Sequence, residues 1–306
     1  MLAIVFPGQG SQYLNMAIDF NHNYIEAKNT FQMIEDITKI KIRKIISENH
    51  QNKLNQTNYT QISIFAASMA IYNTLLNQVG YDRLNPKFVL GHSLGEYSAL
   101  VANKTLNLDD ASNLIKIRGD LMNSAIEPNT SGMAAIIGKS ADLIDEIIEK
   151  NKLEVTIAND NSPMQVVVSG ILSNINSAES VFISSGVKKY IKLNVSAAFH
   201  SKYMENAQIK LINEINKVNF NKVNIPIITN YDANINTELA TIKEALKKQM
   251  ANKVKWTESI KKLEVNGINK IIEIGPSKVL SSLISRISKN FDIISINNVD
   301  DFKKFE

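Results

Sequence analysis

The stretch Phe88-Val-Leu-Gly-His-Ser-Leu-Gly-Glu-Tyr-Ser-Ala-Leu100 joins a short apolar run to a helix-forming run through the motif Gly-x-Ser-x-Gly. The two glycines, Gly91 and Gly95, allow a sharp turn from strand to helix that exposes the Ser93 hydroxyl above a sheet. The start of the helix would bring the positive end of its dipole close to a developing negative charge. A structural Gly/Ser turn fits the same residues, but the strand and the helix expected on either side favour a nucleophilic serine.

A serine nucleophile needs a base, and the chain offers four histidines. His22 and His50 lie in polar segments, and we expect both to be exposed. His92 is next to the serine, where successive side chains diverge, so packing or a structural hydrogen bond is its expected role. His200, in Ala-Phe-His-Ser, follows an expected strand. A lone histidine there would ordinarily be structural, but elimination of the other three makes His200 the candidate base.

Outward from this motif, strand-like apolar runs alternate with helix-like runs, which predicts the α/β class. Strands are expected at residues 2–6, 87–90, 225–229 and 270–274. Helices are expected at 31–46, 61–79, 112–125, 204–218 and 242–250, with two more beginning at residues 96 and 278.

Residues 130–195 show a pattern of their own. Strands are expected at 133–138, 155–158, 165–169 and 188–193, with helices at 141–150 and 173–185 and a turn at Asn159-Asp-Asn-Ser-Pro163. This β-α-β-β-α-β order is the ferredoxin-like arrangement. We therefore expect an α/β-hydrolase-like core with a mainly parallel sheet, made of residues 1–129 and 196–306. An inserted ferredoxin-like subdomain would form from residues 130–195.

Composition excludes several classes of protein. The chain has 306 residues, 44% of them apolar, as in ordinary globular proteins. It contains no cysteine, which excludes disulfides, thiolate metal sites and a cysteine nucleophile. No apolar run approaches the ~20 residues that span a bilayer, and residues 1–6 are typical of a first strand and not of a signal peptide. A net charge of +4 over the whole chain gives no sign of nucleic-acid binding. We expect a cytoplasmic protein with no bound metal and no membrane or nucleic-acid partner.

Two further segments have functional interpretations. Pro7-Gly-Gln-Gly-Ser-Gln12 follows the first expected strand, and its backbone N–H groups could stabilise an oxyanion. It lacks the pattern of a phosphate-binding loop or a dinucleotide-binding turn. Arg118 stands in a mainly apolar helix, where its planar guanidinium suits a carboxylate ligand. A structural ion pair with a neighbour such as Asp120 remains an open alternative.

Together these motifs resemble the malonyl-CoA:acyl carrier protein transacylase family, which loads malonyl groups onto the carrier protein of fatty-acid synthesis. The match extends over nearly the whole chain. It comprises Phe6-Pro-Gly-Gln-Gly-Ser-Gln12, Thr60-Gln61, Gly91-His-Ser-Leu-Gly-Glu96, Arg118 with Met122, Asn161-Ser-Pro163 with Gln165-Val-Val, Phe199-His-Ser201, Gln249, Val254-Lys-Trp-Thr257, Glu273-Ile-Gly-Pro276 and Lys278-Val-Leu280. Ser277 departs from the pattern, since many relatives have glycine there, but the departure does not touch the chemistry.

The resemblance implies a catalytic role for five residues. Ser93 would be the nucleophile and His200 the general base and acid. The backbone carbonyl of Gln249 would orient the histidine. The backbone N–H groups of Gln9 and Leu94 would form the oxyanion hole.

The resemblance also implies a substrate site. Arg118 would pair with the free carboxylate of the malonyl group, and Gln61, Met122, Asn161 and Phe199 would lie at the substrate. Phe199 before the histidine is the pattern that similar enzymes show when they prefer malonyl over methylmalonyl groups.

The implied reaction moves a malonyl group from malonyl-CoA to acyl carrier protein through a serine ester, with no cofactor and with a monomeric enzyme. A serine hydrolase or thioesterase would share Ser93 and His200 without needing Arg118. A non-catalytic interaction module is the remaining alternative, which the intact nucleophile, base and oxyanion turn argue against.

Overall fold

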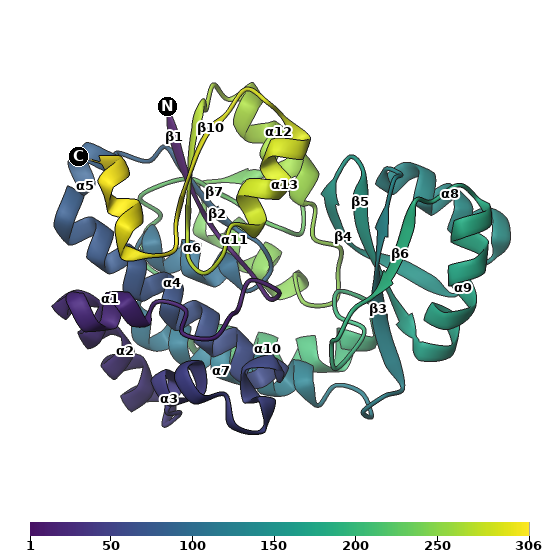
Figure 1. Ribbon diagram of the computed structural model, residues 1–306, viewed down its shortest axis with the longest axis horizontal. Helices are drawn as coiled ribbons and strands as arrows, with labels where there is room; N and C mark the ends of the chain where they lie inside the picture. The colour runs from purple at the N-terminus through teal and green to yellow at the C-terminus, as the bar shows by residue number, and fades with distance from the viewer. Residues whose placement is uncertain (306) are drawn as a thin grey trace.

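The computed structural model describes the backbone of residues 1–305 and the side chains of residues 1–302. A six-stranded sheet forms the larger part of the molecule (Figure 1), in the order β10-β9-β1-β2-β7-β8. Neighbouring strands are parallel except for the pair β7 and β8. The strands are β1 (Leu2–Phe6), β2 (Phe88–Gly91), β7 (Ile227–Ile228), β8 (Ile235–Asn236), β9 (Lys270–Ile274) and β10 (Asp292–Ile296).

Successive side chains of a strand point to opposite faces of the sheet. In this sheet both faces are covered by helices. Ile4 and Phe6 of β1 join the core formed with α4 (Thr57–Val79) and α6 (Gly95–Ala102). Ala3 and Val5 join a second core with α12 (Trp256–Val265) and α13 (Val279–Ile287).

The remaining helices of the larger part surround these layers. They are α1 (Ile18–Asn23), α2 (Ile25–Thr38), α3 (Ile42–Glu48), η1 (His50–Asn55), α5 (Tyr81–Leu84), α7 (Leu108–Asn123), η2 (Lys202–Met204), α10 (Glu205–Lys217), α11 (Leu239–Lys248) and η3 (Val299–Phe305). Within the described residues, no helix is long and apolar enough to cross a membrane.

A separate antiparallel sheet lies at the right of Figure 1, with its two helices on the outer face. Its strand order is β4-β5-β3-β6, and its core is formed by residues of both helices and of β3, β4 and β5, with the partly buried Tyr190 of β6 packed against it. The elements are β3 (Ser131–Ile137), α8 (Ala141–Asn151), β4 (Val155–Ser162), β5 (Gln165–Ile171), α9 (Leu172–Ser184) and β6 (Lys189–Lys192). A parallel bridge between Asn159 and Val254 connects this sheet to the larger part.

The expected mixed α/β fold with a mostly parallel sheet is confirmed, but two local predictions are wrong. Residues 31–46 do not form one helix, because the chain leaves α2 at Lys39 with a left-handed φ of 59° and begins α3 at Ile42. Both helices pack on α4, so the apolar spacing continues across the break. The turn expected at residues 159–163 is also wrong, since β4 continues to Ser162 in pairing with β5.

Candidate active site

Ser93 lies between the carboxyl end of β2 and the start of α6, in a turn that only small neighbours permit. Its φ of 53° is in the left-handed region. A Cβ on Gly95 would lie 2.2 Å from the carbonyl oxygen of Phe6, and a Cβ on Gly91 would lie 1.9 Å from the carbonyl group of Gly95. The close passage of these backbone segments explains why the motif needs glycine at both positions.

The Ser93 hydroxyl meets a buried histidine. Ser93 Oγ lies 2.8 Å from His200 Nε2, and His200 Nδ1 lies 3.0 Å from the backbone carbonyl oxygen of Gln249. A carbonyl oxygen can only accept, so Nδ1 carries the proton and Nε2 is free to accept from the serine. Burial, reinforced by the nearby charge of Arg118, lowers the pKa of His200 to about 3. His200 is therefore neutral near pH 7, as a general base must be.

Arg118 of α7 is completely buried beside the serine. Its guanidinium donates to Gln61 Oε1 at 2.6 Å, to Gln249 Oε1 at 3.0 Å and to Ser93 Oγ at 3.0 Å. Among the described residues it forms no ion pair, and its Nε is buried without a hydrogen-bond partner. The structural ion pair with Asp120 is thus not formed, since Asp120 is exposed. A buried guanidinium without an acidic contact is suited to an anionic ligand.

A cavity of about 260 Å³ opens over Ser93, and most of the residues expected at the site line it. Those residues are Gln9, Ser93, Leu94, Arg118, Met122, Asn161, Phe199 and His200. The other two, Gln61 and Gln249, lie behind Arg118 and hold it. Gln61 also donates to Met122 Sδ at 3.2 Å.

The backbone N–H groups of Gln9 and Leu94 belong to two lining residues of this cavity. Within the described residues, neither N–H donates a hydrogen bond to the protein. Free N–H groups beside a nucleophile are what an oxyanion hole requires.

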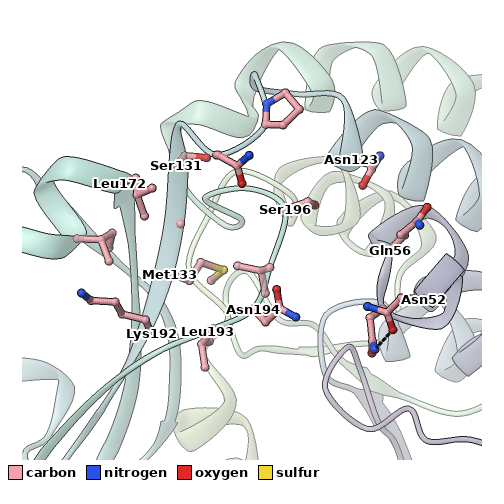
Figure 2. A pocket seen from close by; sticks show the side chains of 16 residues that line it. Asn52, Gln56, Asn123, Ser131, Met133, Leu172, Lys192, Leu193, Asn194 and Ser196 are labelled. Carbon is pink, nitrogen blue, oxygen red and sulfur yellow. Dashed lines mark hydrogen bonds between the residues drawn. The ribbon is translucent and has the colours of Figure 1, made fainter.

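A second cavity, of about 660 Å³, adjoins the first and shares Met133, Leu193 and Val195 with it. Figure 2 shows that its wall combines amide side chains, among them Asn52, Gln56 and Asn194, with apolar ones such as Leu172 and Leu193. The reaction cavity therefore continues into a polar space between η1 and the antiparallel sheet.

The other three histidines lie where the sequence predicted. His22 and His50 are exposed. His92 is partly buried, with its Nε2 2.8 Å from Asn161 Oδ1 and its ring 5.5 Å from that of Trp256. Burial lowers the pKa of His92, so this ring serves packing and a hydrogen bond.

Two residues at the site were missed by sequence reasoning. Asn230, just after β7, accepts from the Ser93 N–H at 2.6 Å and donates to the Gly91 carbonyl oxygen at 2.7 Å. Glu96, quoted as the start of a helix and as the end of the matched motif but given no role, is buried beside it. The signal for Asn230 was its place at the carboxyl end of a strand, but its adjacency to Ser93 depends on β7 pairing with β2.

An α/β fold with this serine turn, a buried neutral histidine and two free N–H groups is the arrangement of a serine enzyme that transfers acyl groups. The sequence matches the family model of the acyl transferase domain over residues 3–303. The chain therefore belongs to the acyl transferase family.

Individual relatives agree with this assignment. The malonyl CoA-acyl carrier protein transacylase of Bacillus subtilis is 35% identical over 97% of this chain and 93% of its own. The solved acyl carrier protein S-malonyltransferase of Vibrio cholerae superposes with a TM-score of 0.94 at 34% identity, covering 100% of this chain and 99% of that one. A malonyl-transacylase solved in complex with a type II PKS acyl-carrier protein has a TM-score of 0.94 at 32% identity, covering 99% and 98%.

Proposed function

We propose that this chain transfers a malonyl group from malonyl-CoA to the phosphopantetheine thiol of acyl carrier protein, through a malonyl ester on Ser93. The observation that carries the proposal is the buried guanidinium of Arg118, which touches Ser93 Oγ and forms no ion pair within the described residues. The names of the relatives support it, because they are malonyl transacylases and one was solved with a carrier protein.

In the first half-reaction, the Ser93 hydroxyl attacks the thioester carbonyl while His200 Nε2 takes its proton. The N–H groups of Gln9 and Leu94 hold the oxyanion of the tetrahedral intermediate. His200 then returns the proton to the departing thiol of coenzyme A, leaving the ester on Ser93. The malonyl carboxylate lies on Arg118, and Gln61 and Gln249 orient the guanidinium.

In the second half-reaction, the carrier thiol attacks the ester carbonyl and gives its proton to His200. Collapse of the second tetrahedral intermediate returns that proton to Ser93 Oγ and releases the malonyl thioester. Met122, Asn161 and Phe199 complete the wall around the acyl group, and Phe199 disfavours the extra methyl of a methylmalonyl group. The reaction uses no cofactor beyond its two substrates.

The proposed organisation of the chain follows the order of the expected strands and helices. We assign residues 1–129 and 196–306 to an α/β-hydrolase-like catalytic subdomain, and residues 130–195 to an inserted ferredoxin-like one. The strand order β4-β5-β3-β6, with α8 and α9 on one face, supports the second assignment. We propose a monomeric enzyme that works in the cytoplasm.

A partition experiment separates transfer from hydrolysis. The enzyme is mixed with malonyl-CoA and increasing holo acyl carrier protein, and malonyl-carrier and free malonate are measured together. We expect malonyl-carrier to account for nearly all product at saturating carrier, and Ser93→Ala to form neither product. Free malonate as the main product at every carrier concentration would identify a thioesterase instead.

A further inference from the structure

Glu96 is a completely buried acid in α6, three residues after the nucleophile. A carboxylate loses its hydration on burial, which is costly unless other groups bind it. Burial raises the pKa of Glu96 to about 7, and hydrogen bonds from Gln249 and Asn230 oppose that shift. The catalytic steps described above do not use this side chain.

One oxygen of Glu96 binds the two residues that hold the nucleophile. Its Oε2 accepts from the Asn230 backbone N–H at 3.0 Å and from Gln249 Nε2 at 2.9 Å. Asn230 Oδ1 in turn accepts from the Ser93 N–H at 2.6 Å, and Gln249 Nε2 also donates to the Ser93 carbonyl oxygen at 2.9 Å. The left-handed backbone of Ser93 is therefore fixed on both of its peptide groups by partners that share Glu96.

Gln249, which Glu96 binds, also contacts His200 and the guanidinium of Arg118. Gln249 follows the last residue of α11, and its backbone carbonyl accepts from His200 Nδ1. Its side-chain Oε1 accepts from Arg118. A shift of Gln249 would thus move the serine, the histidine and the arginine together.

We propose that Glu96 is a positioning residue: it fixes Gln249 and Asn230, and through them the relative placement of Ser93 and His200. It acts by accepting hydrogen bonds, and within the described residues it forms none with Ser93 Oγ or His200. The proposal rests on the proposed function for its kinetic test, and on the structure alone for its spectroscopic test.

The unequal use of the two carboxylate oxygens allows a matched pair of variants. Oε2 accepts both hydrogen bonds, whereas Oε1 is buried without a partner. In Glu96→Gln, the amide oxygen can replace Oε2 and the NH2 group can replace Oε1, so both bonds persist without the charge. Glu96→Leu removes both bonds at similar volume. Ser98→Ala is the control, because Ser98 is buried in the same helix and its hydroxyl has no partner in the described structure.

The kinetic test measures the rate of malonyl-Ser93 formation against malonyl-CoA concentration in single-turnover experiments. For Glu96→Leu we expect the limiting rate to fall about 100-fold, the scale of effect that a small misplacement produces. The half-saturating concentration should change less than about threefold, since Arg118 keeps its hydrogen bond to Gln61 Oε1, which does not depend on Glu96. Glu96→Gln should recover to within about tenfold of the parent, because neutral acceptors bind donors more weakly than charged ones. Ser98→Ala should acylate at the parent rate.

The spectroscopic test uses 15N-histidine, which is practical because the chain has only four histidines. In the parent, His200 should show one protonated and one unprotonated ring nitrogen, as a fixed tautomer requires. Glu96→Leu should move both signals toward each other, and Glu96→Gln should not. This readout applies even if the parent forms no malonyl ester, a result that would refute the proposed function alone.

Two results would overturn the positioning role. One is a Glu96→Leu variant that acylates at the parent rate with unchanged His200 signals. The other is a folded Glu96→Gln variant that is as slow as Glu96→Leu, which would show that hydrogen-bond acceptance is not what Glu96 supplies. If Glu96→Leu does not fold, Glu96→Gln decides by itself, since both its rate and its His200 signals must stay close to those of the parent.

Discussion

We propose that Arg118 determines which acyl groups the site accepts. Its guanidinium is buried and donates to the amides of Gln61 and Gln249, so no acid competes for it by direct contact. Truncating one partner of a buried, hydrogen-bonded charge pair costs about 2–5 kcal/mol. We expect Arg118→Ala to slow malonyl-CoA acylation by roughly 100-fold, which is about 3 kcal/mol, and to speed acetyl-CoA acylation.

Competition between malonyl-CoA and acetyl-CoA, followed by mass analysis of the acyl-enzyme, measures this preference. Lys116→Ala is the matched control, because it removes a positive charge from the same helix. The Lys116 side chain donates to the Thr38 carbonyl oxygen and not to the site. An unchanged acyl preference in Arg118→Ala would remove the proposed role of this arginine.

Glu96 should make the stability of the fold depend on pH. Burial first, then the charge of Asp232, raises its pKa to about 7 from 4.5, against the hydrogen bonds and the charge of Arg118. The folded state therefore binds more protons than the unfolded state between these pH values, and stability is lost as pH rises through this window. Relative to Glu96→Gln, the parent should lose up to about 1.4 kcal/mol per pH unit there and change no further above about pH 8.

Urea unfolding of both proteins at pH 5, 6, 7 and 8 checks this expectation. The comparison cancels the contribution of His200 to the pH dependence, because its lowered pKa affects both proteins alike. A constant difference in unfolding free energy across the series would show that the Glu96 carboxyl does not titrate as its burial implies.

Among the elements, the turn between β2 and α6 has the least steric freedom. A Cβ at Gly95 would meet the backbone oxygen of Phe6 at 2.2 Å, and a backbone atom cannot turn away as a side chain can. We expect Gly95→Ala to destabilise the fold by at least about 3 kcal/mol. Gly132→Ala is the control, because its Cβ would meet only Leu172 Cδ1 at 3.4 Å, and we expect it to cost less than about 1 kcal/mol. Urea midpoints of the two variants measure both; equal costs would contradict the steric account.

Sequence periodicity predicted an element well where a run of apolar residues is buried as a unit. It predicted less well where pairing between strands overrides the local preference of the residues. The strands at β1 and β9 match their predicted bounds. Residues 159–162 were predicted as a turn from their Asn, Asp and Ser content, yet pairing with β5 makes them a strand. The strand β10 and the helix α12 were not predicted, although Trp256, Ile260 and Leu263 of α12 recur at helical spacing.

Some residues of the candidate site were predictable from the sequence and others were not. Ser93 lies in a contiguous motif, elimination among the four histidines leaves His200, and the guanidinium of Arg118 suits a carboxylate, so these three are predictable from the residues. The resemblance supplied Gln9 and Leu94 as the oxyanion donors, together with Gln249 and the pocket residues. The structure brings these residues together, while their catalytic roles remain proposals. Glu96 and Asn230 could not be predicted, because their contacts join α6 to the end of β7 across 134 positions of sequence.

At the scale of the whole molecule, the cavity lies between the two sheets, so their contact has to be firm. Asp160 of β4 accepts from Thr257 Oγ1 at 2.6 Å, and Thr257 belongs to α12 of the larger part. Hydrogen bonds to charged groups contribute about 1.5–3 kcal/mol. We expect Thr257→Val to lower the free energy of unfolding by about that amount.

Thr156→Val is the control for this prediction. Thr156 is an exposed residue of β4, the strand that contains Asp160. Its effect should stay within about 0.5 kcal/mol. Urea unfolding followed by both tryptophan fluorescence and circular dichroism measures the two costs. A Thr257→Val cost no larger than that of Thr156→Val would mean that this bond does not hold the two parts together.

The most direct test of the proposed reaction is intact-mass analysis of the protein after brief exposure to malonyl-CoA, followed by addition of holo acyl carrier protein. The parent should gain one malonyl group and lose it to the carrier, whereas Ser93→Ala should gain none. A malonyl adduct that persists in Ser93→Ala, or a parent that never forms one, would contradict transfer through a serine ester.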